Sequence, residues 1–454
     1  IMRATLLLAT LSQGVAAPAT AAVGERQGPQ KPKLTLQEAV ERALAFHPDL
    51  AQARALEEGA AAQVGEAVAR RLPQIGARAS ATRFQEPMIV RPLHGFDIAE
   101  PPEFDRTLLQ GNLTAALTLF DGGERRARVR GSRATFRAAE VGLDQVSQDL
   151  VATVTHRYLA VLGAARLADA HEAGVRALQA ESLRVEQLLS EGRAAPVQLL
   201  QVSAALAQTQ AEGVDVASRL ELAELDLARA VGVNVSETRA ERLAEVRLTH
   251  TARHEDRAAV LARLDGGNLE LRKAQLELQA ARWNRRAAKS AWLPSLDLTA
   301  GYLGFGAAGG DVTGEWQAAL RLGYPLFLGG ARGARLRRTD WEARAAEQRY
   351  LSARLRAEEA ADRALSAVAR GDAQVVAVEA AVRHLTELVR IEALRVAEGS
   401  GTETEFLDAE SRLRRARAQL IEARHQAIIA RVEVARLTGE LSLEWLEATL
   451  EEEQ

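Results

Sequence analysis

The stretch Leu119-Phe120-Asp121-Gly122-Gly123 returns in the second half of the chain as Leu326-Phe327-Leu328-Gly329-Gly330, at a shift of 207 residues. The pair Glu191-Gly192 returns as Glu398-Gly399 at the same shift. Similarity at a fixed spacing is the mark of an internal repeat, in which each half folds into the same series of elements. The 454-residue chain is therefore expected to be two copies of one structural unit.

The spacing changes upstream of these motifs. Leu72-Pro73 matches Leu293-Pro294 at a shift of 221, so the first half carries 14 additional residues between the two sets of motifs. The additional residues fall in a proline-containing segment, Gln85 to Asp105, which lacks helical or strand periodicity and is expected to be a loop. Each half then reads as helix, strand, loop, strand, long helix, turn and helix.

Four segments alternate between apolar and polar residues over about ten positions, the length that a tilted membrane strand needs. They lie at about 73–84 and 107–120 in the first half, and at about 294–304 and 314–327 in the second. The apolar positions are Ile75, Ala77, Ala79 and Ala81; Leu109, Leu113, Leu117 and Leu119; Leu296, Leu298, Ala300 and Tyr302; and Trp316, Leu320, Leu322 and Tyr324.

A soluble sandwich alternates in the same way, so one such strand decides little. Four strands in an otherwise helical chain, however, can neither close a barrel nor leave their edges unpaired in lipid, where each unpaired backbone group costs several kcal/mol. Strands from other copies of the chain are therefore expected to complete the sheet. Two copies would give eight strands and three copies twelve.

The segments after the strands are predicted to be unusually long helices. Residues 124–190 and 331–397 contain no proline, and about 65 helical residues span roughly 100 Å. Apolar residues on heptad seams predict coiled-coil packing: Val175, Leu178, Val185 and Leu189 in one, and Val378, Val382, Leu385, Val389 and Val396 in the other. Each helix then turns at a glycine and returns, over 196–230 and 403–437. The fold class is mainly α with a small membrane β part.

Composition narrows the function. The net charge of −3, from 58 basic and 61 acidic residues, gives no field that would attract nucleic acid. The absence of cysteine excludes disulfides, thiolate sites and the lipobox of a bacterial lipoprotein. Residues 1–22 read as a secretory signal, cleaved near Ala21 or Ala22, and no later run of 18 apolar residues predicts a membrane-spanning helix.

No catalytic motif stands out. The chain offers no nucleophile elbow, phosphate-binding glycine loop or convincing carboxylate dyad, so we expect no enzyme and no cofactor. His250 and His254 are four residues apart and could ligate a metal, but without other ligands nearby they are expected to be a surface pair. The arginines just past the strands are expected to form a solvated helix face, with contact to lipid phosphate as a second role: Arg125, Arg126, Arg128, Arg130 and Arg133, and Arg332, Arg335, Arg337 and Arg338.

From Leu34 to Leu441 the chain resembles the TolC family of outer-membrane efflux proteins. The resemblance is carried by Leu34-Thr35-Leu36-Gln37-Glu38-Ala39-Val40 followed by His47-Pro48-Asp49-Leu50, by Leu72-Pro73 before a strand, by Leu119-Phe120-Asp121-Gly122-Gly123 after one, and by Glu398-Gly399 before Phe406-Leu407-Asp408-Ala409. Each motif is weak by itself. Their order and their duplication make the resemblance specific.

The resemblance implies a cell outer membrane location and a passive trans-periplasmic exit duct of a tripartite efflux or type I secretion system. It implies a homotrimer, in which four strands from each protomer form a 12-stranded β-barrel continued by an α-helical barrel. A periplasmic adaptor, an inner-membrane pump and outer-membrane lipid would be its partners. Two alternatives stay open: a periplasmic adaptor, which would need additional soluble β domains, and a coiled-coil structural protein.

The resemblance also implies site residues. Glu405 and Asp408 match the acidic ring that narrows the periplasmic entrance, and their i, i+3 spacing places them on one helix face. Capping of the helix start is the plainer explanation, and the first-half equivalents, Gln198 and Gln201, carry no charge. The turns at Gly192 and Gly399 match the adaptor-docking tips, although a C-cap glycine alone would explain each.

These expectations divide the chain into a signal peptide (1–22), a first repeat (34–235), a linker or equatorial segment (236–264), a second repeat (265–441) and a C-terminal tail (442–454).

Overall fold

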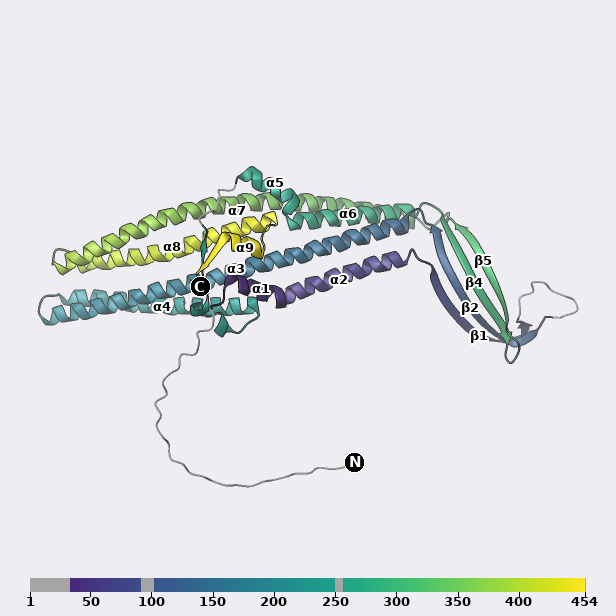
Figure 1. Ribbon diagram of the computed structural model, residues 1–454, viewed down its shortest axis with the longest axis horizontal. Helices are drawn as coiled ribbons and strands as arrows, with labels where there is room; N and C mark the ends of the chain where they lie inside the picture. Colours follow the sequence, from purple (N-terminus) through teal and green to yellow (C-terminus); the bar gives the residue numbers. More distant parts are fainter. Residues whose placement is uncertain (1–32, 91–101, 250–255, 454) are drawn as a thin grey trace, which may run out of the picture.

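The computed structural model describes residues 33–90, 102–249 and 256–453. These residues form an elongated body, with a four-stranded sheet at one end and two helix-turn-helix hairpins reaching to the other (Figure 1). The predicted signal segment and the pair His250 and His254 lie outside the described residues. None of the helices in the described part of the chain combines the length and the apolar character that crossing a bilayer requires.

The duplication is confirmed by the lengths of the helices. The 11-residue helix α1 (Leu36–Phe46) matches α5 (Arg257–Gly267), and the 22-residue helix α2 (Pro48–Ala69) matches α6 (Leu269–Ser290). The two longest helices, α3 (Glu124–Ser190) and α7 (Ala331–Ala397), have 67 residues each. The returning helices, α4 (Pro196–Val231) and α8 (Glu403–Thr438), have 36 each.

Local sequence explains where the helices begin. The Thr35 side chain accepts from the Glu38 N–H at 3.1 Å and caps α1. Pro48 occupies the first turn of α2, where its missing N–H is not needed, so the chain bends at His47 and restarts as a helix. Gly123 and Gly330 precede α3 and α7 with φ of 86° and 83°, a left-handed conformation that favours glycine and turns a strand into a helix.

The four strands form one antiparallel sheet. Its strands are β1 (Gln74–Ile89), β2 (Phe104–Phe120), β4 (Ser295–Ala307) and β5 (Thr313–Gly323), in the order β1-β2-β4-β5. The register aligns Ala77 with Leu113, Leu113 with Tyr302, and Tyr302 with Trp316, so the apolar positions share a face across all four strands. The predicted apolar face is thus continuous over the sheet, and it is uncovered in one chain, since Trp316 is 77% exposed and Leu322 71%.

The segment from Gln85 to Asp105 is not a loop over its whole length, and that prediction was wrong at both ends. β1 continues to Ile89, β2 begins at Phe104, and Met88 pairs with Asp105. The register shifts between Arg83 and Met88. Pro87 lies within this shift, because a residue without an N–H is tolerated where the ladder is irregular. At the other end of the sheet β5 stops at Gly323, two residues before Pro325.

The main core lies midway along the body, where both repeats meet. Tyr158 of α3 is fully buried, and its hydroxyl lies 2.8 Å from the carbonyl oxygens of both Leu34 and Ala244. A second, two-stranded sheet pairs β3 (Glu245–Leu248) with β6 (Leu450–Glu453), which follows the short helix α9 (Leu443–Thr449). The residues expected as a linker and a tail thus join one another beside the helices.

Candidate functional site

The hairpin tips farthest from the sheet are built by two equivalent turns (Figure 1). After α3, the Gly192 N–H donates to the Leu189 carbonyl at 3.0 Å and the Arg193 N–H donates to the Leu188 carbonyl at 2.8 Å. Gly399 and Ser400 repeat the arrangement after α7, at 3.1 and 2.9 Å. Both glycines have a φ near +70° and both sites are open around the position of a Cβ. The Schellman motif accounts for the glycines and leaves the tips uncovered.

Glu405 begins α8 as part of a complete capping box. The Thr402 hydroxyl accepts from the Glu405 N–H at 3.3 Å, and the Glu405 carboxylate accepts from the Thr402 N–H at 3.1 Å. Hydrogen bonds donated to the carboxylate by Thr402, first from its backbone N–H and then from its hydroxyl, lower the pKa of Glu405. The carboxylate is exposed and ionised at neutral pH, so it contributes a fixed negative charge as well as a cap.

Asp408 lies one turn farther along the same face, and it is paired. Its carboxylate lies 2.6 Å from the Arg412 guanidinium, and both side chains are more than half exposed. Exposed pairs of this kind contribute about 0–1 kcal/mol and exchange readily with solvent. Within one protomer, Arg412 therefore offsets much of the charge of Asp408, and Glu405 is the less compensated of the two.

The first repeat has no charge at the equivalent place. The Ala195 N–H donates to the Gln198 side-chain oxygen at 2.8 Å, which is half of a capping box, because Ala195 has no oxygen to complete it. Gln201 is exposed and uncharged. A ring of carboxylates at these two helix positions is therefore supplied by the second hairpin alone.

At the opposite end of the helices, Arg125 and Arg332 are held by neighbouring side chains, whereas the other arginines past the strands are mostly exposed, as a solvated helix face predicts. Arg125 pairs with Asp121 at 2.8 Å, and both are about one-fifth exposed. Partial burial would raise the pKa of Asp121, but hydrogen bonds from Arg125 and Gly123 outweigh it and lower that pKa. Arg332 lies over Trp292 and Tyr324, with its guanidinium carbon 5.0 and 5.4 Å from the ring centroids.

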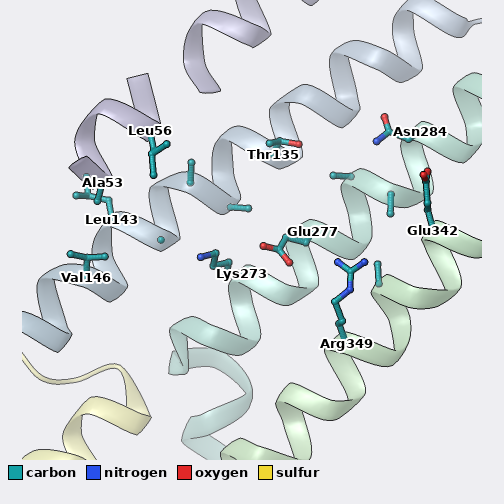
Figure 2. Close-up of a pocket in the computed structure, with 16 residues that line it drawn as sticks. Ala53, Leu56, Thr135, Leu143, Val146, Lys273, Glu277, Asn284, Glu342 and Arg349 are labelled. Carbon is teal, nitrogen blue, oxygen red and sulfur yellow. The ribbon is translucent and has the colours of Figure 1, made fainter. Parts of the chain in front are cut away.

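A groove of about 490 Å³ separates the helices nearer the sheet. α2, α3, α6 and α7 line it, and the side chains of Lys273, Glu277 and Arg349 point into it opposite Leu143 and Val146 (Figure 2). Charges of both signs alternate with alanines, a lining without the convergent polar groups of a small-molecule site. Among the described residues, no three His, Asp or Glu side chains gather closely enough to hold a metal ion.

The model of the outer membrane efflux protein family matches residues 39–233 and 260–440, most of the chain. The chain belongs to the outer membrane efflux protein family. It is an outer-membrane efflux channel that extends into the periplasm, and its fold is that of channel proteins. The family resemblance predicted from the sequence motifs is confirmed.

Solved structures of channels have the same fold as this efflux protein. A membrane protein from Pseudomonas aeruginosa is 21% identical, with a TM-score of 0.77 over 90% of this chain and 91% of that one. VceC from Vibrio cholerae is 21% identical, with a TM-score of 0.75 over 89% and 96%. The open state of the Neisseria gonorrhoeae MtrE channel is 20% identical, with a TM-score of 0.72 over 90% and 89%. No curated protein matches the sequence.

Sequence reasoning found the acidic residues of the efflux protein but missed their cation. Arg412 stands four residues after Asp408, the spacing at which side chains meet on a helix, so the pair was readable in principle. The partly buried histidines of α3 and α8, His156 and His425, were also missed. Partial burial lowers the pKa of His425 to about 4, and no motif in the sequence marks that residue as lying inside the helix packing.

Proposed function

We propose that this efflux protein is the protomer of a homotrimeric, passive exit duct of a tripartite efflux or type I secretion system. Three four-stranded sheets would close a twelve-stranded barrel in the outer membrane, and the helices would continue it as a tunnel through the periplasm. One observation carries the proposal: a sheet with an exposed apolar face and two unpaired edges is mounted on 67-residue helices.

The exposed sheet face supports contact with outer-membrane lipid. Ile75, Tyr302, Trp316 and Leu320 are 58–77% exposed on one face of the four strands. Apolar surface of this extent is costly in water, whereas lipid covers it without cost. The outer edges of β1 and β5 have no strand paired with them in the described part of this chain. Inside a bilayer, only closure into a barrel satisfies the backbone groups of both edge strands.

The helices set the distance between membrane and entrance. Sixty-seven residues at 1.5 Å each span roughly 100 Å, so the tips lie far out in the periplasm when the sheet is in the membrane. A channel of this length carries no energy source of its own. An inner-membrane pump would supply the energy, and a periplasmic adaptor would join the pump to the tips at Gly192 and Gly399.

Glu405 and Asp408 are proposed as the gating ring of the periplasmic entrance. In a trimer they bring six carboxylates to one level of the tunnel, where like charges repel and attract cations. The lowered pKa keeps Glu405 ionised, while Arg412 tempers the charge of Asp408. We therefore expect Glu405 to dominate cation selectivity.

Single-channel recording in planar bilayers tests the gate. Glu405→Gln with Asp408→Asn removes two charges per chain but keeps the capping box, because glutamine at this position can still accept from the Thr402 N–H. We expect a several-fold rise in open time or conductance and weaker cation selectivity. The matched control, Gln198→Glu in the first hairpin, adds charge at the equivalent place. An unchanged double variant would remove the gating role and leave the duct intact.

Apolar side chains near the tips support adaptor docking. Val197 and Leu200, in the first turns of α4, are 56% and 69% exposed. Changing both to serine should abolish efflux of a fluorescent substrate from cells without altering the conductance of the purified channel. Full efflux by this variant would count against docking at the first tip.

A further inference from the structure

The internal repeat is preserved at the level of individual strand pairs. In the first hairpin Ile75 pairs with Ala115, and in the second Leu296 pairs with Leu322. The β1 residues map onto β4 with a shift of 221 and the β2 residues onto β5 with a shift of 207, for every pair from Gln74↔Ala116 to Arg83↔Thr107. The two hairpins are therefore equivalent in register as well as in shape.

The pairing that joins the two hairpins, β2 with β4, has no repeat-related equivalent among the residues that the structure describes. β2 of the first hairpin pairs with β4 of the second, aligning Ala115 with Ala300. Adding 207 to the β2 residue and subtracting 221 from the β4 residue gives the equivalent pairing of β5 with β1. It aligns Leu322 with Ala79, and Leu320 with Ala81. β5 and β1 are the opposite edges of the sheet, so this pairing requires a second copy of the chain.

The described helices also lack one repeat-related contact within the chain, and equivalent surfaces of α3 and α7 therefore differ in burial. Gly131, Ala134, Ala138 and Val141 form a buried stripe along α3. At Gly131 the neighbouring helix α6 is in contact, because an added Cβ would lie 3.2 Å from the Asn284 Oδ1 and 3.5 Å from the Trp283 Cβ. This stripe is covered because α6 packs along it.

The equivalent stripe of α7 lies bare. It consists of Arg338, Trp341, Ala345 and Gln348, and all four are exposed, Trp341 to 64%. By the repeat, the helix that should cover it is the counterpart of α6, which is α2. In this chain α2 packs against α3 instead, so only the α2 of another copy can reach α7.

At the α3–α6 contact the small side chains lie on the long helix, whereas at the α7–α2 contact between copies they would lie on the short helix. Within the chain, Gly131 meets Trp283; between copies, Arg338 would meet Ala62. Gly59 and Ala62, exposed on α2, replace Ala280 and Trp283 of α6 and leave room for Trp341. A large residue facing a small one is kept at both junctions, with the roles reversed, which is the complementarity that close packing needs.

We infer that β5 and α7 of one copy bind β1 and α2 of the next copy in the register of the internal repeat, with Leu322 opposite Ala79 and Trp341 against Gly59 and Ala62. This inference rests on the proposed function, because a chain of such contacts closes into the ring that the duct needs. It adds the residues and the register of the contact.

Cysteine cross-linking tests the register directly, because the chain has no cysteine of its own. Leu322→Cys with Ala79→Cys, oxidised by copper phenanthroline in isolated outer membranes, should give a ladder of covalent oligomers on a non-reducing gel. The matched control is Ala115→Cys with Ala300→Cys, which occupies the equivalent ladder position within one chain. It should form an intrachain disulfide and run as a monomer.

Two offset variants test for slippage. Leu322→Cys with Ala77→Cys or with Ala81→Cys places the sulfur-bearing residues on a diagonal of about 7–8 Å, at or beyond the reach of a disulfide. We expect less than about a tenth of the cross-linked product. If an offset pair links better, the register is overturned while the duct stands.

The other outcomes are equally distinct. If the intrachain control forms but no β5–β1 pair links, while wild-type protein still conducts, then these edges do not meet and the inference fails alone. If wild-type protein is monomeric in the outer membrane and forms no pore, the proposed function fails with it.

Discussion

The two repeats of this efflux protein have the same helix lengths and strand registers, yet they bury different surfaces. The α3 stripe around Ala134 is covered by α6, and the equivalent α7 stripe around Trp341 is open to solvent. The shared pattern explains how each half folds. The differences between the halves indicate where the chain meets other copies, and only the second hairpin has carboxylates at the positions of Glu405 and Asp408, since the first has Gln198 and Gln201 there.

The largest effect is expected where the second repeat makes a backbone contact that the first lacks. Gly232 and Gly439 both end returning helices with a φ of 76°, but an added Cβ at Gly439 would overlap the Gly267 carbonyl oxygen, whereas Gly232 is open. Gly439→Ala should cost about 4 kcal/mol of unfolding free energy. Gly232→Ala should cost about 1 kcal/mol, from the left-handed backbone alone. Equal losses in denaturant unfolding would show that the Gly267 contact is not rigid.

The second effect depends on pH. Burial of His425 against Gly163 lowers its pKa from 6.5 to about 4, and the first repeat has Ser218 in its place. Because the unfolded chain binds the proton more readily, stability is unaffected above pH 6.5, falls between pH 6.5 and 4, and is fully reduced below that, by about 3 kcal/mol. Burial also lowers the pKa of His156, which acts in the same direction.

The test is the pH dependence of unfolding in His425→Ser, which copies the first repeat. The variant should lose most of the decline between pH 6.5 and 4. A decline as steep as in the wild-type protein would place the responsible group elsewhere.

The third effect separates folding from assembly. Trp341→Ala should weaken the contact between copies by about 2 kcal/mol, the loss typical of a central interface residue. The oligomer should dissociate at a lower temperature on a semi-native gel while the helical circular dichroism of the protomer is kept. Ala134→Trp, the converse change inside the chain, should instead destabilise the protomer. Oligomers of Trp341→Ala as heat-resistant as wild type would contradict an inter-copy role for this stripe.

The smallest effect concerns the two tips. Thr402→Ala should cost about 1 kcal/mol at the start of α8, because the Glu405 N–H loses its cap. Ala195→Thr should give a similar gain at the start of α4, since it completes the box that Gln198 begins. Hydrogen exchange of the first turn of each helix measures both changes. No change in exchange at either tip would mean that other contacts hold the hairpin ends.

Much of the fold could be predicted because its signals are local. Glycines and prolines mark the ends of the four long helices, and strict alternation marks the apolar sheet face. The ends of β1 and β2 were missed because Pro87 and the register shift disrupt the alternation. The β3–β6 pair was missed because four-residue strands far apart in sequence have too few positions to show a pattern.

The candidate site was predictable only in part. The positions of Glu405 and Asp408 came from family motifs, and the capping box of Thr402 and Glu405 is a local pattern. The exposure of the α7 stripe, by contrast, depends on which helix packs against which. That information is a property of the folded chain and of its neighbours rather than of any sequence window.

Single-channel recording of the purified protein, with its oligomer and monomer fractions separated in detergent, tests whether the oligomer is a channel. We expect discrete conductance steps from the oligomer and none from the monomer, because four strands alone cannot enclose a pore. Conductance from the monomer, or a heat-resistant oligomer that never conducts, would contradict this expectation.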